Sequence, residues 1–429
     1  MTSPLERASV VGAAPPPDLE SYRIQARAWL SGNLELRDRA AEELEIDHFT
    51  PDVMTSNRAL QRRLFEGGYA GISWPREFGG QGLTKSHEEA FFQEASNFVM
   101  PEFGLLSDTT FDTCVPTMLK HASPDFLKRF IPKVMGGDAL VCQFFSEPSA
   151  GSDLAAVRTK ATRANDGWVI RGQKLWSSWA QLADWGMCLA RTDWDAPKHR
   201  GLTWFTVPCN ATGLTIRPIA QITGETDFCE EFFDDVLVSD DDRIGAVGDG
   251  WTIAQTMLVY ERGAGRRADA GGLSGPGPLA PDLMALVGQA GRLSDPIAQQ
   301  LVAQVHINDY VGRALMSRID QLNRMGRLTP GTAAYGKLFA GVYNPIRARI
   351  ALTLGGPEAV AWDADSSSDG GTAWAYLNGR RMSIAGGTNE MQRNAIAERA
   401  LGMPREPTSD RDRPFSESLR DADRWRTTP

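Results

Sequence analysis

Apolar residues recur at helical spacing through the first part of the chain. They fall on one face of a helix with 3.6 residues per turn, at Tyr22, Ala26, Trp29 and Leu30. The pattern predicts further helices over 60–66, 87–98 and 108–136. We therefore expect an N-terminal helical domain over residues 19–138, after a disordered leader rich in proline and alanine over residues 1–18.

The pattern changes to short apolar runs separated by turn residues over residues 139–240. These runs predict strands at 140–145, 167–172, 185–192, 202–207 and 231–238. Several short strands in one such stretch are typical of a compact β-barrel or β-sandwich. This stretch is therefore predicted to be a middle β domain.

Helical periodicity returns after Trp251 and continues to Leu401. It predicts helices over 253–262, 282–291, 296–323, 333–354 and 389–401. We expect a C-terminal helical bundle over residues 241–404. Residues 405–429 are charged and poor in apolar side chains, which predicts a mobile tail.

Composition excludes several classes of protein. A chain of 429 residues exceeds one ordinary core, so two or three domains are expected. A net charge of -9 argues against binding to nucleic acid or to an anionic membrane surface. No apolar run approaches the roughly 20 residues of a membrane span, and the N-terminus has no signal-peptide pattern. The five scattered cysteines indicate free thiols in a reducing cytoplasm, and the isolated histidines predict no metal site.

Two segments carry the candidate chemistry, Cys142–Asp153 and Gly172–Ser178. Gly151 allows a backbone to approach a large planar ligand closely. Trp176 offers a flat face, and short hydroxyl donors are supplied by Ser146, Ser152, Ser177 and Ser178. Either segment alone is also typical of a turn rich in glycine and serine. The pair in this order and spacing favours a binding site.

These segments, with Gly386–Arg393 and the loop Trp74–Gly80, resemble the acyl-CoA dehydrogenase family over roughly residues 20–405. The resemblance implies an α+β protein with the acyl-CoA dehydrogenase fold: an N-terminal helical domain, a middle β-barrel or sandwich, and a C-terminal four-helix bundle. It also implies FAD as cofactor, an acyl-CoA substrate and an electron-transfer flavoprotein as electron acceptor.

The resemblance assigns roles to individual residues. The pyrimidine side of the flavin would be lined by Gln143, Phe145, Ser146 and Ser152, with Ser146 donating to the ring. Trp176 and Ser178 would cover the ring edge and reach N5. Thr388 and Glu390 would contact the adenosine half of FAD. Substrate contacts would come from Ser152, Arg262 and Gly387, and the backbone N–H of Gly386 would donate to the enolate oxygen.

The catalytic base is predicted at Glu261. Most family members carry the base just before the Gly-Thr pair, where this chain has Gly386. One branch places it on an earlier helix, directly before an arginine, and here Glu261 precedes Arg262. A base needs only its carboxylate at the α carbon, so this position is chemically equivalent. The alternative is an ordinary helical glutamate paired with Arg262 or Arg266.

Two other carboxylates in the first motif are given low catalytic weight. Glu147 and Asp153 belong to the turn that follows Phe145. Glu147 is predicted to hold a buried ion pair or to cap backbone amides instead.

The chain departs from the family pattern in two places. Residues 271–294 lack the Arg-x-x-Phe-Gly run that reaches a neighbour's FAD, and Leu352–Pro357 replaces the segment that carries the adenine-binding glutamine. Both losses resemble actinobacterial dehydrogenases that act on steroid side chains as two-chain α2β2 assemblies. A homo- or heterotetramer with a related chain, and a bulky acyl group, are therefore expected.

Two alternatives stay open. In the first, the chain is a non-catalytic partner subunit that shapes the FAD site of its mate. In the second, it is a fold relative that oxidises a non-thioester substrate or hydroxylates with flavin and oxygen.

Overall fold

The computed structural model describes residues 16–37, 51–263, 280–327, 331–361, 371–408 and 410–427. They belong to two compact units. The first comprises residues up to Phe103 together with Leu127–Ala139, and the second comprises Gly104–Phe126 and all residues from Leu140 onward. Most of the predicted leader, residues 1–15, lies outside the described residues.

The first unit is helical. Its elements are α1 (Leu19–Asn33), α3 (Pro51–Glu66), the short η2 (Arg76–Phe78), α4 (Lys85–Ala95) and most of α7 (Pro124–Met135). The predicted face of α1 is buried, since Tyr22, Ala26 and Leu30 are each less than 5% exposed. Asp18 caps the helix by accepting the Ser21 N–H at 3.0 Å.

The second unit begins with short helical elements before its sheet. They are α5 (Leu105–Ser107), the π-helical η3 (Asp108–Cys114) and α6 (Val115–His121). The Thr110 hydroxyl accepts the Val141 N–H at 2.9 Å, so η3 is bonded to the first strand. This explains why residues 104–126 group with the sheet. The predicted domain boundary at 138 stays a prediction based on the family pattern.

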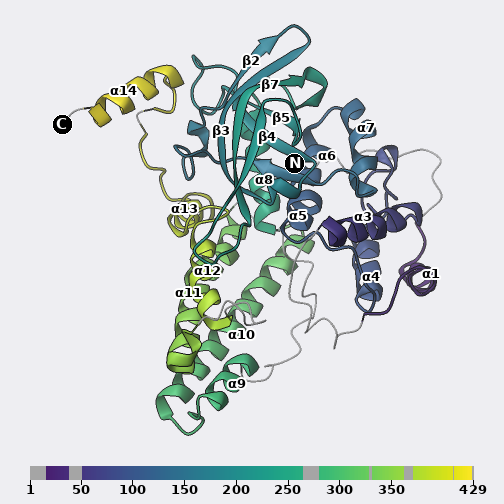
Figure 1. Cartoon of the computed structure of the whole chain (residues 1–429), viewed down its shortest axis with the longest axis vertical. Helices are drawn as coiled ribbons and strands as arrows, with labels where there is room; N and C mark the ends of the chain where they lie inside the picture. The colour runs from purple at the N-terminus through teal and green to yellow at the C-terminus, as the bar shows by residue number, and fades with distance from the viewer. Residues whose placement is uncertain are drawn as a thin grey trace. The chain divides into compact units, whose positions relative to one another are not determined.

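One eight-stranded sheet forms the centre of the second unit (Figure 1). Its strands are β1 (Val141–Phe144), β2 (Lys160–Ala164), β3 (Gly167–Ser178), β4 (Trp185–Arg191), β5 (Leu202–Pro208), β6 (Leu214–Ile219), β7 (Phe228–Ser239) and β8 (Arg243–Ile244). The order is β6-β7-β3-β2-β4-β5-β8, with β1 parallel to β4.

The strands extend the prediction in four places. β2, β6 and β8 were not expected, and β3 continues beyond Gly172 through the whole second motif. The motif Gly172–Ser178 is therefore a strand rather than a turn. Its backbone is fixed by pairing with β7 from Gly172 to Ser178.

Helices complete the second unit. They are α8 (Gly250–Gly263), α9 (Pro281–Gln289), α10 (Pro296–Arg324), α11 (Thr332–Gly355), η7 (Gly356–Ala359), α12 (Gly371–Asn378), η8 (Gly379–Ser383), α13 (Asn389–Ala395) and η9 (Ile396–Ala400). The long α10 and α11 pack side by side (Figure 1), and a core that includes Val302, Val305 and Leu354 joins them to α9. No helix in the described ranges has both the length and the apolar run that crossing a membrane requires.

The C-terminal segment differs from the predicted mobile tail. It contains α14 (Phe415–Thr427), and Phe415 is only 3% exposed. The guanidinium carbon of Arg191 lies 3.7 Å from the centre of the Phe415 ring. Lys198 pairs with Asp410 at 2.7 Å and with Asp153 at 3.0 Å. The Phe415 ring and the Lys198 ammonium therefore hold the C-terminal segment in place, although the composition of this segment is typical of a solvated chain.

Phe415→Ala is expected to undock α14. The change removes a desolvated cation–π contact that contributes about 2 kcal/mol. Limited proteolysis should then cut within residues 405–427 faster than in the unchanged chain, while the sheet stays protected. Leu419→Ala serves as the control on the same helix. Equal cleavage rates for Phe415→Ala and the unchanged chain would contradict the docking.

Candidate functional site

The two sequence motifs meet at one end of the sheet. The Leu175 N–H donates to the Ser146 carbonyl at 3.0 Å, and the Lys174 ammonium donates to the Phe145 carbonyl at 3.0 Å. These bonds hold the loop after β1 against β3. The predicted flavin residues of both motifs are thus brought into one place: Gln143, Phe145, Ser146, Trp176 and Ser178.

Trp176 stands at a β-bulge. The register of β3 against β7 shifts between Leu175 and Ser177, and Trp176 has a φ of 69°. A bulky residue rarely adopts this left-handed backbone conformation, which costs about 1–3 kcal/mol and is concentrated at functional sites. The bulge leaves the Trp176 side chain 55% exposed. An exposed indole on a rigid strand offers a flat apolar surface to a ligand.

Other residues of the motif fit a planar polar ligand. The Gln143 side-chain nitrogen is buried and has no hydrogen-bond partner among the described residues. An unsatisfied buried donor is costly, so it indicates a missing acceptor. A Cβ added at Gly151 would meet no atom within 4 Å, which leaves open space beside the exposed Ser152. These residues fit the isoalloxazine ring of FAD.

Glu147 holds the buried ion pair predicted for it. Its carboxylate lies 2.9 Å from the Lys174 ammonium, and it accepts the N–H groups of Arg158 and Thr159 at 2.6 and 2.8 Å. Burial alone would raise the pKa of Glu147. The attraction to Lys174 and the two N–H donors outweigh burial and lower that pKa. Glu147 is therefore an ionised structural group that fixes the loop after β1.

Glu261 and Gly386 lie side by side. Gly386 has a φ of 65°, and a Cβ built on it would be 3.4 Å from the Glu261 carboxylate oxygen Oε1. Burial and then the charge of Glu261 raise the pKa of the Cys114 thiol, and Cys114 contacts the Cys142 carbonyl at 3.9 Å. The carboxylate of Glu261 is therefore close to the 386 position, and its charge acts on Cys114 of η3.

The side chain of Gln392 fixes the turn at Gly386 and Gly387. This fully buried side chain donates to both glycine carbonyls, at 3.1 and 2.9 Å. Thr388 caps α13 by accepting the Met391 N–H at 3.2 Å. Glu390 is exposed and lies 3.5 Å from Arg393. The side chain of Arg262, and all of Arg266, lie outside the described residues.

Asp227 connects the bulged strand to the segment before Gly386. It accepts the Trp179 indole N–H at 3.0 Å and pairs with Arg381 of η8 at 3.4 Å. Trp179 directly follows Ser178. The loop between β6 and β7, which carries Asp227, therefore contacts both the end of β3, where the flavin edge is predicted, and η8, which precedes Gly386.

The sequence prediction missed two buried charged groups, Lys174 and Glu231. Both are fully buried and face each other across β3 and β7. Their sequence neighbours gave no signal, because Lys174 follows Gln173 and Glu231 follows Glu230, a pattern typical of solvated strand positions.

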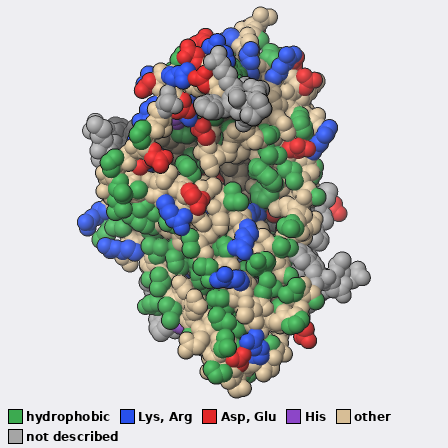
Figure 2. Space-filling view, turned by 90° about the vertical axis from the view of Figure 1, so that its left-hand side faces the viewer, with side chains coloured by type: hydrophobic (Ala, Val, Ile, Leu, Met, Phe, Trp, Pro, Cys, Tyr) green, Lys and Arg blue, Asp and Glu red, His purple; other side chains and the backbone are tan. Residues whose placement is uncertain are grey.

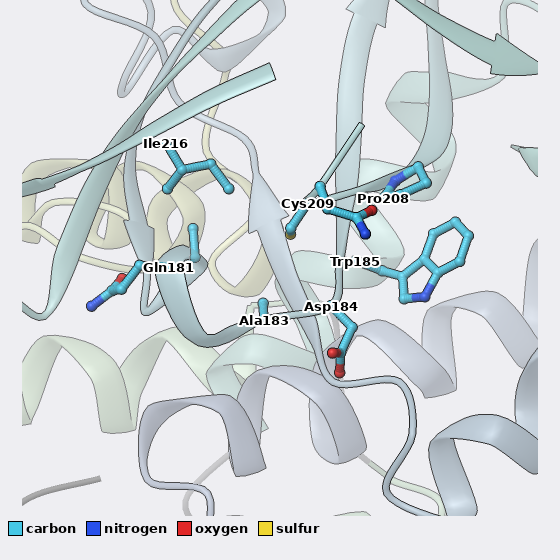
Figure 3. Close-up of a pocket in the computed structure, with 9 residues that line it drawn as sticks. Gln181, Ala183, Asp184, Trp185, Pro208, Cys209 and Ile216 are labelled. Atoms are coloured by element: carbon cyan, nitrogen blue, oxygen red, sulfur yellow. The ribbon is translucent and has the colours of Figure 1, made fainter. Parts of the chain in front are cut away.

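A pocket of about 590 Å³ lies elsewhere in the unit, at the adjoining ends of β4 and β5 (Figure 3). Gln181 and Ile216 lie on one side of it, and Trp185 and Pro208 on the other. The Asp184 carboxylate accepts the Leu140 N–H at 2.8 Å and so serves the backbone. None of the predicted site residues is among the described residues that line this pocket.

Comparison with known proteins agrees with this arrangement. Family models of the acyl-CoA dehydrogenase N-terminal, middle and C-terminal domains match residues 17–138, 142–236 and 248–401. The chain is 35% identical to acyl-CoA dehydrogenase IpdE1 of Mycobacterium tuberculosis, over 91% of this chain and 99% of that protein.

Solved structures give the same result. The steroid ACAD Tcur3481-Tcur3483 is 26% identical with a TM-score of 0.70, over 92% of this chain and 99% of that one. The ChsE4-ChsE5 complex of Mycobacterium tuberculosis is 26% identical with a TM-score of 0.67, over the same shares. The predicted α+β fold is confirmed, and the chain belongs to the acyl-CoA dehydrogenase family.

Proposed function

We propose that this protein is an FAD-dependent dehydrogenase that converts an acyl-CoA thioester into a trans-2-enoyl-CoA, with Glu261 as the catalytic base. The observation that carries the proposal is the 3.4 Å separation between the Glu261 carboxylate and the position where a side chain at 386 would begin. A glycine at 386 leaves room there for a carboxylate that arrives from α8.

The residues have distinct parts in the reaction. Glu261 takes the proton from the carbon α to the thioester carbonyl. The backbone N–H of Gly386 donates to the thioester oxygen as negative charge develops there. Gln392 holds the carbonyls of Gly386 and Gly387, so the turn does not need to reorganise during the reaction. Ser152, Arg262 and Gly387 are proposed to contact the substrate.

The cofactor is proposed to lie against the bulge of β3. Bound FAD supplies the acceptor for the hydride that leaves the β carbon. Trp176 would cover the ring edge, while Gln143, Ser146 and Ser178 would donate to its polar atoms and Phe145 would pack beside it. Thr388 and Glu390 are proposed to contact the adenosine half. An electron-transfer flavoprotein is the proposed electron acceptor.

A related chain is the proposed partner. Exposed apolar side chains follow α10 and α11, among them Ile307, Tyr310, Val311, Met316 and Val342. A groove of about 430 Å³ between these helices is lined by Leu338, Phe339 and Ile346, among others. Figure 2 shows hydrophobic side chains over much of this side of the molecule. Apolar patches of this kind are typical of subunit interfaces.

The partner and the acyl group are inferred together. Two of the similar structures are named as pairs, Tcur3481-Tcur3483 and ChsE4-ChsE5, and the first is a steroid ACAD. We infer a homo- or heterotetramer with a related chain, acting on a bulky or steroid-derived acyl-CoA.

The visible spectrum of the purified chain tests the proposal. A yellow protein whose flavin band bleaches on anaerobic addition of an acyl-CoA supports the dehydrogenase, and the bleaching substrate identifies the acyl class. A colourless chain that turns yellow only with a related chain supports the two-chain assembly, and Glu261→Gln kinetics in the assembled complex then separate a catalytic from a non-catalytic subunit. A flavin that resists every acyl-CoA but turns over with oxygen supports a non-thioester substrate.

A further inference from the structure

Glu231 is a carboxyl group buried inside the sheet. It lies on β7 opposite Lys174 of β3 and is fully buried. Its oxygen Oε2 accepts the Ser177 hydroxyl at 2.9 Å. Its oxygen Oε1 is buried without a hydrogen-bond partner among the described residues. The carboxyl group is therefore only half satisfied.

The neighbouring cation is committed elsewhere. The Lys174 ammonium bonds to Glu147 and to the Phe145 carbonyl, and the hydrogen bonds described for it do not include Glu231. Burial raises the pKa of Glu231 to about 7, and the Ser177 hydroxyl and the charge of Lys174 offset burial only in part. Near neutral pH, Glu231 therefore exists in both its acid and its ionised form.

Ser177 links this carboxyl group to the outer surface of the strand. It follows directly after the bulge, between Trp176 and Ser178, and its buried side chain points inward. A β-bulge changes the direction in which neighbouring side chains point. The directions of the Trp176 and Ser178 side chains therefore depend on the contacts that fix Ser177 between them. The hydroxyl of Ser177 is held by Glu231.

We propose that Glu231 is a positioning residue that, through Ser177, holds Trp176 and Ser178 in the geometry that binds flavin, and that ionisation of Glu231 strengthens this hold. The inference rests on the proposed function, because it takes Trp176 and Ser178 to contact FAD. The Ser177 hydroxyl donates to the Glu231 carboxyl group. This hydrogen bond is stronger when its acceptor is ionised than when it is neutral.

The other groups that face Glu231 are Lys174 on β3, its neighbour Glu230 on β7 and three buried thiols. Burial raises the pKa of these thiols, to about 12 for Cys188 and about 11 for Cys229, and also well above its usual value for Cys142. A pH dependence between pH 6 and 9 that Glu231→Gln removes therefore belongs to Glu231.

The test is the affinity of the full-length chain for FAD between pH 6 and 9, measured by flavin fluorescence. The affinity of the unchanged chain should rise about tenfold as pH rises through 7, which corresponds to a difference of one pKa unit between the free and FAD-bound protein. Glu231→Gln cannot ionise and should bind FAD with a flat profile. Ser177→Ala should also be flat, at the weaker affinity. Glu230→Gln is the matched control and should keep the slope.

Three further results decide the matter. A slope that Glu231→Gln leaves unchanged overturns this inference alone. Failure of the unchanged chain to bind FAD at any pH, both alone and with a related partner chain, overturns the proposed function as well. Thermal unfolding without FAD gives an independent readout. Since the folded chain retains a proton that the unfolded chain has lost, its melting temperature should fall between about pH 4.5 and 7 more than that of Glu231→Gln.

Discussion

Glu261→Gln is expected to slow the reduction of bound flavin by an acyl-CoA about 10²–10⁴-fold, the usual contribution of a positioned general base. The amide keeps the size and polarity of the carboxylate but cannot accept a proton from carbon. Substrate binding should change little, because the thioester oxygen is bound by the Gly386 turn. The measurement is the anaerobic decay of the flavin absorbance band at saturating acyl-CoA.

Two further variants make this test specific. Glu20→Gln changes an exposed carboxylate on α1 and should reduce flavin at the normal rate. The double change Glu261→Gly and Gly386→Glu places the carboxylate on residue 386, whose Cβ would lie 3.4 Å from the present position of the Glu261 oxygen Oε1, and should restore part of the rate. Restoration will be partial, because a glutamate with the φ of 65° at this position is strained by about 1–2 kcal/mol. Rapid flavin reduction by Glu261→Gln would contradict the assignment of the base.

Lys174→Met is expected to lower the free energy of unfolding by about 3–5 kcal/mol. The change keeps the length of the side chain but leaves Glu147, whose side chain is 4% exposed, without its cation. The carboxylate then retains only its two backbone N–H donors. Denaturant titration of the chain without cofactor measures the loss.

A surface ion pair on the same strand supplies the control. Arg171 pairs with Asp235, and their side chains are 65% and 49% exposed. Arg171→Met should therefore cost at most about 1 kcal/mol. Adding Glu147→Gln to Lys174→Met should recover part of the stability, because no buried charge is then left alone. If Lys174→Met lowers the free energy of unfolding no more than Arg171→Met does, the Lys174–Glu147 ion pair does not stabilise the loop after β1.

Elements with a regular apolar pattern were predictable, and those held by tertiary contacts were not. α1 and α10 have apolar faces that a period of 3.6 residues identifies. β2 buries one residue of five, Ala161, so its sequence has no strand signal. Six of the 13 residues of α14 are charged, and the helix becomes ordered through Phe415 and a guanidinium more than 200 positions away in the sequence. Local pattern carries no information about such a partner.

The candidate site divides in the same way. The two motifs and the Glu-Arg pair could be recognised because their chemistry is local in sequence. The bulge at Trp176 could not, since it arises from pairing with β7. Glu231 lies among three other acidic residues between 230 and 235, and such a run is typical of a solvated strand. Only the register against Lys174 and Ser177 shows that it points inward.

A fluorescent label at position 420, on an exposed side of α14, would sit within energy-transfer distance of the loop that carries Ser152. α14 has 13 residues and is therefore about 20 Å long. Its first residue is docked on Arg191, and Lys198 joins Asp410 to Asp153, the residue after Ser152. α14 is thus a natural reporter of order in that loop, and a bulky fusion partner attached to it would strain the same contacts.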